Sequence, residues 1–141
     1  MKPVATLAAI ATLTASLGLA AAPALAADAE AGEKLFSRCK ACHMIVNGDE
    51  VIQKGGKTGP NLYGVIGRQA GAEEGFRYKD SIVEAGEKGL VWTEELLADY
   101  VADPRKFLMT YLEDKRAKSG MTFKLKKGGE DVAAYLASVA Q

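Results

Sequence analysis

The segment Cys39-Lys40-Ala41-Cys42-His43 constrains this chain most, because it contains the only two cysteines and the only histidine among 141 residues. Two cysteines three positions apart, followed at once by a histidine, form the attachment pattern of a c-type haem. Each thiol can add to one vinyl group on the same edge of the porphyrin, and the histidine then offers a ring nitrogen to the iron. The pattern therefore predicts a chain folded around one covalently attached haem.

Three other uses of these residues stay open. A Cys39–Cys42 disulfide of the thioredoxin type is expected to follow a strand, whereas the preceding residues have a helical pattern. A structural zinc site needs four ligands, and this segment supplies three, with no second pair elsewhere. A pair of buried thiols without any chemistry would leave the adjacent His43 unexplained.

The first 26 residues have the features of a secretory signal peptide. A positive start is followed by an uncharged apolar run over residues 4–22, and Ala24-Leu25-Ala26 then offers small residues at a cleavage site. A retained membrane anchor is the alternative, since the apolar run is long enough to span a bilayer. The proline before the cleavage site favours removal, so we expect a leader over residues 1–26 and one exported, periplasmic domain over residues 27–141.

The composition of residues 27–141 excludes some classes of protein. The segment has 17 basic and 18 acidic residues, a net charge of −1, which does not suit a generally basic nucleic-acid binder. It has no second apolar stretch of membrane length, so we expect no stable membrane insertion. Its 115 residues include 14 glycines, and a core this small needs a disulfide, a metal or a large bound group to stabilise it.

Hydrophobic periodicity and capping residues predict helices near both ends of the domain and between them. Residues 47–72 carry repeated glycine, proline and asparagine turn signals and are predicted to be irregular loop, which is unusual in a compact domain unless it wraps a bound group. No segment shows sustained β alternation, so the predicted fold class is all-α. The predicted helices begin near Asp28, cover about 78–85, follow a cap at Thr93, run from Asp103-Pro104 to about Tyr111, and begin near Gly129.

An electron-carrying haem iron needs a second axial ligand, and methionine is the natural choice because no second histidine exists. Met1 leaves with the leader, and Met44 follows His43 too closely to reach the opposite face of a haem. Met109 lies in a predicted helix, where a methionine commonly fills core space. Met121 lies in a predicted loop that is free to fold over an iron, so it is favoured over Met109.

The chain resembles the class I c-type cytochromes, in particular the bacterial cytochrome c2 (cytochrome c550) group, over essentially all of residues 27–141. The resemblance implies the class I cytochrome c fold, in which the terminal helices cross at positions matching Gly32 and Phe36 and long loops surround one haem c attached through Cys39 and Cys42. The motifs that carry it are Cys39-Lys40-Ala41-Cys42-His43, Lys57-Thr58-Gly59-Pro60-Asn61-Leu62-Tyr63-Gly64, Gly67-Arg68, Gly75-Phe76-Arg77-Tyr78, Val91-Trp92, Tyr100-Val101-Ala102-Asp103-Pro104 and Met121-Thr122-Phe123.

The resemblance also implies roles for single residues. His43 and Met121 match the axial ligands of the iron, and Pro60 matches the proline whose carbonyl accepts a hydrogen bond from the ligand histidine. Tyr100 matches a tyrosine near the methionine sulfur. Without the resemblance, the aromatic positions are equally typical of a core and the arginine of a solvated surface. The residues that match contacts to the haem carboxylates are Arg68, Tyr78, Trp92 and Ser119.

The charges are distributed unevenly along the chain. Residues 73–103 carry nine acidic and three basic residues, a net charge of −6, whereas residues 104–127 carry eight basic and two acidic residues, a net charge of +6. Because the basic residues flank Met121, we expect a positive surface there that attracts acidic partners, with association rates raised by about 10–10³-fold at low salt. A merely solvated lysine-rich surface is the alternative.

These features predict a monomeric one-electron carrier and not an enzyme. By resemblance, it takes electrons from a cytochrome bc complex and gives them to a photosynthetic reaction centre or a cytochrome oxidase, docking through residues 105–127. A haem enzyme or gas sensor with a labile sixth ligand, for instance a peroxidase, is the alternative, but it needs an open site and a distal acid–base group. An exported disulfide or zinc domain without haem is the third possibility.

Overall fold

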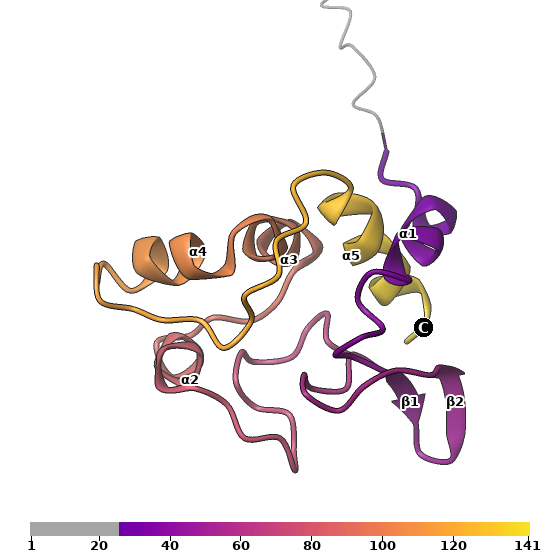
Figure 1. Cartoon of the computed structure of the whole chain (residues 1–141), viewed down its shortest axis with the longest axis horizontal. Helices are drawn as coiled ribbons and strands as arrows, with labels where there is room; N and C mark the ends of the chain where they lie inside the picture. Colours follow the sequence, from indigo (N-terminus) through magenta and orange to yellow (C-terminus); the bar gives the residue numbers. More distant parts are fainter. Residues whose placement is uncertain (1–25) are drawn as a thin grey trace, which may run out of the picture.

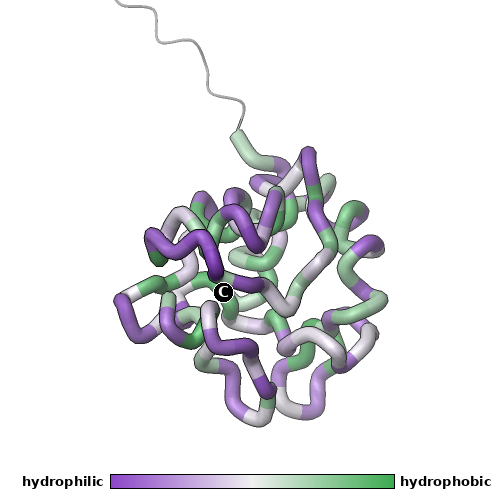
Figure 2. The backbone as a smooth tube through the Cα atoms, turned by 60° about the vertical axis from the view of Figure 1, so that its left-hand side comes forward, coloured by the Kyte–Doolittle hydropathy of each residue, from purple (hydrophilic) through white to green (hydrophobic). Residues whose placement is uncertain are grey.

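The computed structural model describes residues 26–141, so the predicted leader, apart from Ala26, lies outside the described residues. Within that range the chain forms five helices and one small sheet (Figure 1). No helix of the described range is long and apolar enough to cross a membrane, and Figure 2 shows short hydrophobic and hydrophilic stretches alternating along the chain. The elements are α1 (Ala29–Phe36), β1 (Ile45–Asn47), β2 (Glu50–Gln53), α2 (Asp80–Glu87), α3 (Glu94–Ala102), α4 (Pro104–Tyr111) and α5 (Gly129–Ser138).

The predicted helix starts are confirmed, and three have a side-chain cap. Asp28 accepts hydrogen bonds from the backbone N–H groups at the start of α1, Thr93 accepts one from Leu96 at 3.1 Å, and Asp103 accepts one from Lys106 at 3.1 Å. Each cap pairs an otherwise unsatisfied donor of the first turn. Pro104 occupies the first turn of α4, where its missing N–H costs nothing.

Helices α1 and α5 cross near one end of the molecule (Figure 1). At the crossing, a Cβ added to Gly32 would lie 1.9 Å from the carbonyl oxygen of Asp131, so only glycine allows the two backbones to approach this closely. Next to it, the rings of Phe36 and Tyr135 are 5.8 Å apart. The predicted crossing of the terminal helices is therefore confirmed, and it fixes the end of α1 from which the Cys-His segment continues.

An aromatic cluster lies between α3 and α4. The rings of Trp92 and Tyr100 are 4.9 Å apart, and both contact the ring of Phe107, which stacks on Tyr111. Trp92 and Tyr100 are almost fully buried. Burial of such large rings stabilises the α3–α4 pair and gives the buried Tyr100 hydroxyl a fixed position.

The prediction of irregular loop throughout residues 47–72 is wrong at its beginning, where β1 and β2 form an antiparallel hairpin. The strands have only three and four residues, too few to show alternation in the sequence, and Val51 is exposed. Contacts distant in sequence hold the hairpin: Asn61 bonds to both backbone groups of Val46, and Gln53 donates to the Tyr135 hydroxyl at 2.8 Å. The remainder of the segment is turns and loop.

Candidate haem site

The end of α1 leads directly into the Cys-His segment. The Cys39 N–H donates to the carbonyl of Phe36 at 2.8 Å, and the His43 N–H donates to the carbonyl of Cys39 at 2.9 Å. The segment therefore continues as helix-like turns, as the sequence predicts, and no strand precedes it. The two cysteines are not joined in a disulfide; Cys39 is half-buried and Cys42 is exposed. Burial raises the pKa of the Cys39 thiol.

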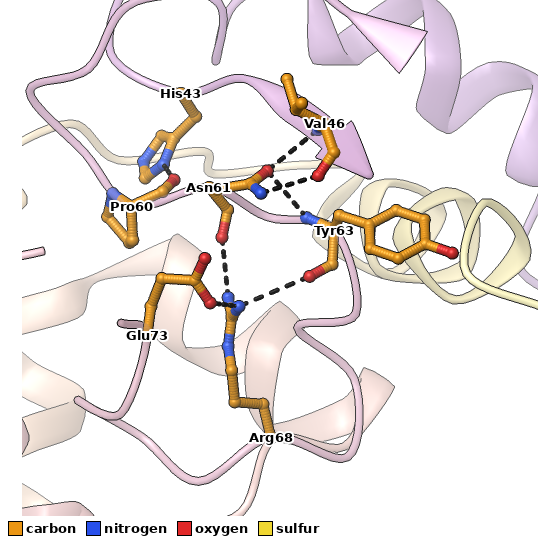
Figure 3. A network of polar contacts seen from close by, with 7 residues as sticks. All are labelled: His43, Val46, Pro60, Asn61, Tyr63, Arg68 and Glu73. Atoms are coloured by element: carbon orange, nitrogen blue, oxygen red, sulfur yellow. Dashed lines mark hydrogen bonds and ion pairs between the residues drawn. The ribbon is translucent and has the colours of Figure 1, made fainter. Parts of the chain in front are cut away.

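The ring of His43 is held by Pro60, as the resemblance implies. Its Nδ1 lies 2.8 Å from the Pro60 carbonyl oxygen (Figure 3). Because a carbonyl can only accept, Nδ1 carries the proton and the lone pair lies on Nε2. Burial lowers the pKa of His43 below 6.5, and the bond to Pro60 opposes that shift in part. The result is a neutral imidazole with one oriented nitrogen ready to ligate a metal.

Glycines allow the loop before Pro60 to pack against the Cys-His segment. The Gly56 N–H donates to the Lys40 carbonyl at 2.9 Å, and the Gly59 N–H donates to the Cys42 carbonyl at 2.8 Å. A Cβ on Gly59 would lie only 2.3 Å from Cε1 of the His43 ring. The absence of a side chain at Gly59 therefore creates the space in which the imidazole lies.

Asn61 and Arg68 extend this network away from the histidine (Figure 3). The Asn61 side chain accepts from the Val46 N–H at 3.0 Å and donates to the Val46 carbonyl at 2.8 Å. Arg68 donates to the Asn61 carbonyl at 2.8 Å and to the Tyr63 carbonyl at 3.4 Å. Arg68 also forms an ion pair with Glu73. Arg68 is half-buried and held by these contacts through both terminal nitrogens, unlike a solvated surface charge.

The structure also brings together three of the predicted residues: Tyr100 on α3, and Ser119 and Met121 on the stretch between α4 and α5. The Ser119 hydroxyl lies 3.3 Å from the Tyr100 hydroxyl and accepts a hydrogen bond from the Met121 N–H at 3.1 Å. Burial raises the pKa of Tyr100, so its hydroxyl stays protonated. Met121 is half-buried against the core. Tyr78 is also half-buried, and its ring packs edge-on against Phe76 at 4.8 Å.

Sequence reasoning missed two residues of this site. Asn61 follows Pro60 directly, but of these two residues the sequence resemblance assigns a role only to Pro60. An asparagine after a glycine and a proline is a common source of side-chain hydrogen bonds to nearby backbone. Glu73 gave no sequence signal, because an acidic residue in a loop is ordinarily solvated. Its pairing with Arg68 is a result of the tertiary structure.

The side chains present fit a haem c better than the alternatives. The side chains are one neutral imidazole, one half-buried thioether and two cysteines outside any disulfide, spaced for two vinyl groups. Across residues 26–141 no group of three or more histidine, cysteine, aspartate or glutamate residues could hold a metal ion, so the donors do not suit a zinc site. The space beside Gly59 holds an imidazole whose Nε2 makes no hydrogen bond within the described residues.

Known proteins provide close matches to this chain, although no protein-family model matches it. Cytochrome c2 of Rhodobacter capsulatus is 62% identical over 123 residues, which cover 86% of this chain and 89% of the relative. Cytochrome c-550 of Paracoccus denitrificans is 54% identical over 123 residues, covering 83% and 79%. The solved structure of the R. capsulatus protein matches with a TM-score of 0.79, covering 81% of this chain and 99% of that chain.

The sequence identities, the shared fold and the Cys-His segment show that the chain belongs to the class I c-type cytochromes. Within that class its similarity is to cytochromes c2 and c-550. It accordingly binds one haem c, attached through Cys39 and Cys42, and it is an electron carrier of the class I type.

Proposed function

We propose that the protein is a periplasmic, monomeric one-electron carrier in which His43 and Met121 ligate the haem iron in both oxidation states. The observation that carries the proposal is the oriented His43 ring, with Nδ1 bonded to the Pro60 carbonyl and Nε2 left for the metal. The haem supplies a ferric/ferrous couple, and a His/Met ligand pair favours a high potential. The chain orients the ligands, limits access of water and sets the charges around the couple.

Several half-buried polar side chains support contacts to the haem carboxylates, which need partners when they leave water. Arg68 is half-buried and presents a planar donor group. Ser119 joins the Tyr100 hydroxyl to the Met121 backbone and thereby positions the methionine segment. The residues that we propose as carboxylate contacts are Arg68, Tyr78, Trp92 and Ser119.

An absorption spectrum tests the axial ligands. We expect the oxidised protein to show the weak red band of methionine-bound ferric iron and the reduced protein to bind carbon monoxide poorly. Met121→Ala should abolish that band, lower the potential and open the iron to carbon monoxide. Met109→Ala, the control in α4, should change none of these. If Met121→Ala resembles wild type and Met109→Ala does not, Met109 is the ligand; ready carbon monoxide binding by the wild type would favour the enzyme or sensor function.

The basic residues of segment 105–127 support docking to acidic faces of membrane redox complexes. A surface groove beside Met121 is lined by Arg105, Lys118 and Lys124 together with smaller polar and apolar residues. Lys118 is exposed, and its amino group takes part in no ion pair of the described residues. We propose that a cytochrome bc complex reduces the protein at this surface and that a photosynthetic reaction centre or a cytochrome oxidase oxidises it.

Ionic strength tests this docking surface. Reduction by a bc complex should slow as salt screens the attraction, and Lys118→Gln should slow it at low salt only. Lys34→Gln is the matched control, because Lys34 lies on α1 in a surface pair with Glu30. Rates that do not depend on salt, or equal effects of the two variants, would reject the proposed surface.

Mass spectrometry of protein recovered from the periplasm tests cleavage before Ala27.

A further inference from the structure

The Arg68 guanidinium contacts two kinds of group, backbone carbonyls and a carboxylate. Two backbone carbonyls, of Asn61 and Tyr63, accept hydrogen bonds from its guanidinium. The Glu73 carboxylate forms an ion pair with the same group, and the two side chains are only 17% and 21% exposed. Figure 3 shows the Glu73 side chain pointing toward the guanidinium, from five positions further along the same stretch of chain. Such limited exposure reduces screening by water and salt, so the pair is electrostatically significant.

We propose that Glu73 is a positioning residue for Arg68 and that, through this contact, it lowers the reduction potential of the haem. The proposal rests on the proposed function, specifically on Arg68 facing a haem carboxylate. Nothing in the axial ligand set depends on Glu73. Its influence is electrostatic and acts through the orientation and charge of one guanidinium.

The direction of the effect follows from charge. Reduction adds an electron to the haem, so a nearby negative charge disfavours the ferrous state and a nearby positive charge favours it. The guanidinium has a fixed number of N–H donors, and the carboxylate of Glu73 takes part of them and part of the positive charge. Removing that carboxylate leaves more of Arg68 for the haem carboxylate. Both consequences raise the potential.

The neighbouring residue provides a matched control. Glu74 carries the same charge one position along the chain, but it is exposed and forms no ion pair among residues 26–141. An exposed charge is screened by water and salt. Glu73→Gln and Glu74→Gln therefore remove the same charge, but only Glu73→Gln removes a half-buried carboxylate in contact with Arg68.

Spectroelectrochemical titration of the holoprotein at low and high salt tests the proposal. Glu73→Gln should shift the ferrous-to-ferric ratio at a fixed potential about three- to tenfold toward ferrous at both salt concentrations, and Glu74→Gln less than about twofold. Glu73→Asp, which keeps the charge, should restore most of the wild-type value. Equal shifts for Glu73→Gln and Glu74→Gln would overturn the proposal, as would a lowered melting temperature with an unchanged potential.

A double-mutant cycle with Arg68→Gln shows whether Glu73 acts through Arg68. Arg68→Gln alone should lower the potential, and the shift caused by Glu73→Gln should change when Arg68 is already gone. Additive shifts would show independent action and reject the positioning role. If Arg68→Gln lowers the potential but Glu73→Gln does nothing, this inference fails while the proposed role of Arg68 stands. If Arg68→Gln leaves the potential unchanged, both fail.

Discussion

The two proposed iron ligands come from regions of very different construction. His43 lies in a helix-like turn against a loop that contacts it through the Pro60 carbonyl, the Gly59 backbone and the network around Asn61. Met121 lies between α4 and α5 in a stretch without helix or strand. This stretch, the Met121 loop (residues 112–128), packs three buried apolar side chains, Leu112, Ala117 and Leu125, into the core, but its polar contacts are single hydrogen bonds centred on Ser119.

The contacts of the Met121 loop are also more widely spaced. The Leu125 N–H donates to the Val101 carbonyl at 2.8 Å, and Lys124 forms an ion pair with Asp103 at 2.7 Å. The Lys118 N–H donates to the Ser81 hydroxyl of α2 at 3.1 Å. The polar contacts of Lys118 and Lys124 are exposed, and a segment held by exposed hydrogen bonds opens at lower free energy than one held by buried ones. We therefore expect the histidine side to control global stability and the Met121 loop to control local opening.

The largest effect is expected at Gly59. In Gly59→Ala, the new methyl group would overlap the His43 ring, 2.3 Å from Cε1, and displace it from Pro60. We expect the free energy of unfolding to fall by about 3 kcal/mol, measured by urea denaturation of the holoprotein. Gly120→Ala on the Met121 loop is the control, because its Cβ would meet only the flexible Lys79 side chain at 3.1 Å. Equal losses of unfolding free energy in the two variants would contradict the expectation that the histidine side controls global stability.

Asn61 ranks second. Its side chain makes three hydrogen bonds to the backbone, at 2.8–3.2 Å, two with Val46 and one from the Tyr63 N–H. In Asn61→Ala these partly buried backbone groups lose their partners, and we expect a loss of about 2 kcal/mol in the free energy of unfolding. Asn47→Ala, at the exposed hairpin turn, should cost under about 0.5 kcal/mol. A loss at Asn61 as small as at Asn47 would show that the hairpin does not depend on this side chain.

A substitution at Ser119 tests the expectation that the Met121 loop controls local opening. Ser119→Ala removes the hydrogen bonds to the Tyr100 hydroxyl and the Met121 N–H, so loop opening should become about 1 kcal/mol easier, or about fivefold more frequent. The measurement is the rate at which imidazole binds the ferric protein. Ser138→Ala, near the end of α5, should leave that rate unchanged. An unchanged rate in Ser119→Ala would mean that other contacts hold the loop.

The sequence predicts the helices and the cofactor well because both are encoded locally. Asp28, Thr93 and Asp103 cap helices with their own neighbours, and the Cys-His segment needs only one turn of chain. The resemblance then correctly places Pro60 beside His43. A domain of this size commonly needs a bound group to stabilise it. The long glycine-rich loops therefore also indicate a cofactor.

The parts that could not be predicted depend on residues distant in sequence. The hairpin is held by Asn61 and by Gln53 contacting Tyr135, 82 residues away. A hairpin signal was nevertheless present, since Asn47-Gly48 lies between two short apolar runs. Glu73 is different: it lies only five positions from Arg68 in the same irregular stretch, but no local pattern distinguishes it from the exposed Glu74.

The smallest effect concerns the pH dependence of the Met121 loop. Asp103 caps α4 and forms the ion pair with Lys124, whose hydrogen bond is the main cause that holds the pKa of Asp103 below its ordinary 3.8. A carboxyl with a depressed pKa stabilises the fold above its unfolded-state pKa, and that stabilisation is lost as the pH falls through the folded-state value. Asp103→Asn should therefore lower the urea midpoint near neutral pH, and the difference from wild type should vanish as the pH falls through the lowered pKa of Asp103.

Asp99→Asn provides the comparison for this last effect, because Asp99 lies on the exposed surface of α3 and forms no ion pair in the described chain. Its midpoint should follow that of the wild type throughout the titration. The exposed position of Asp103 keeps the effect small, since water and salt screen its attraction to Lys124. A difference for Asp103→Asn that persists unchanged into acid would assign its contribution to helix capping by the uncharged side chain, and the ion pair would then not help to hold the Met121 loop.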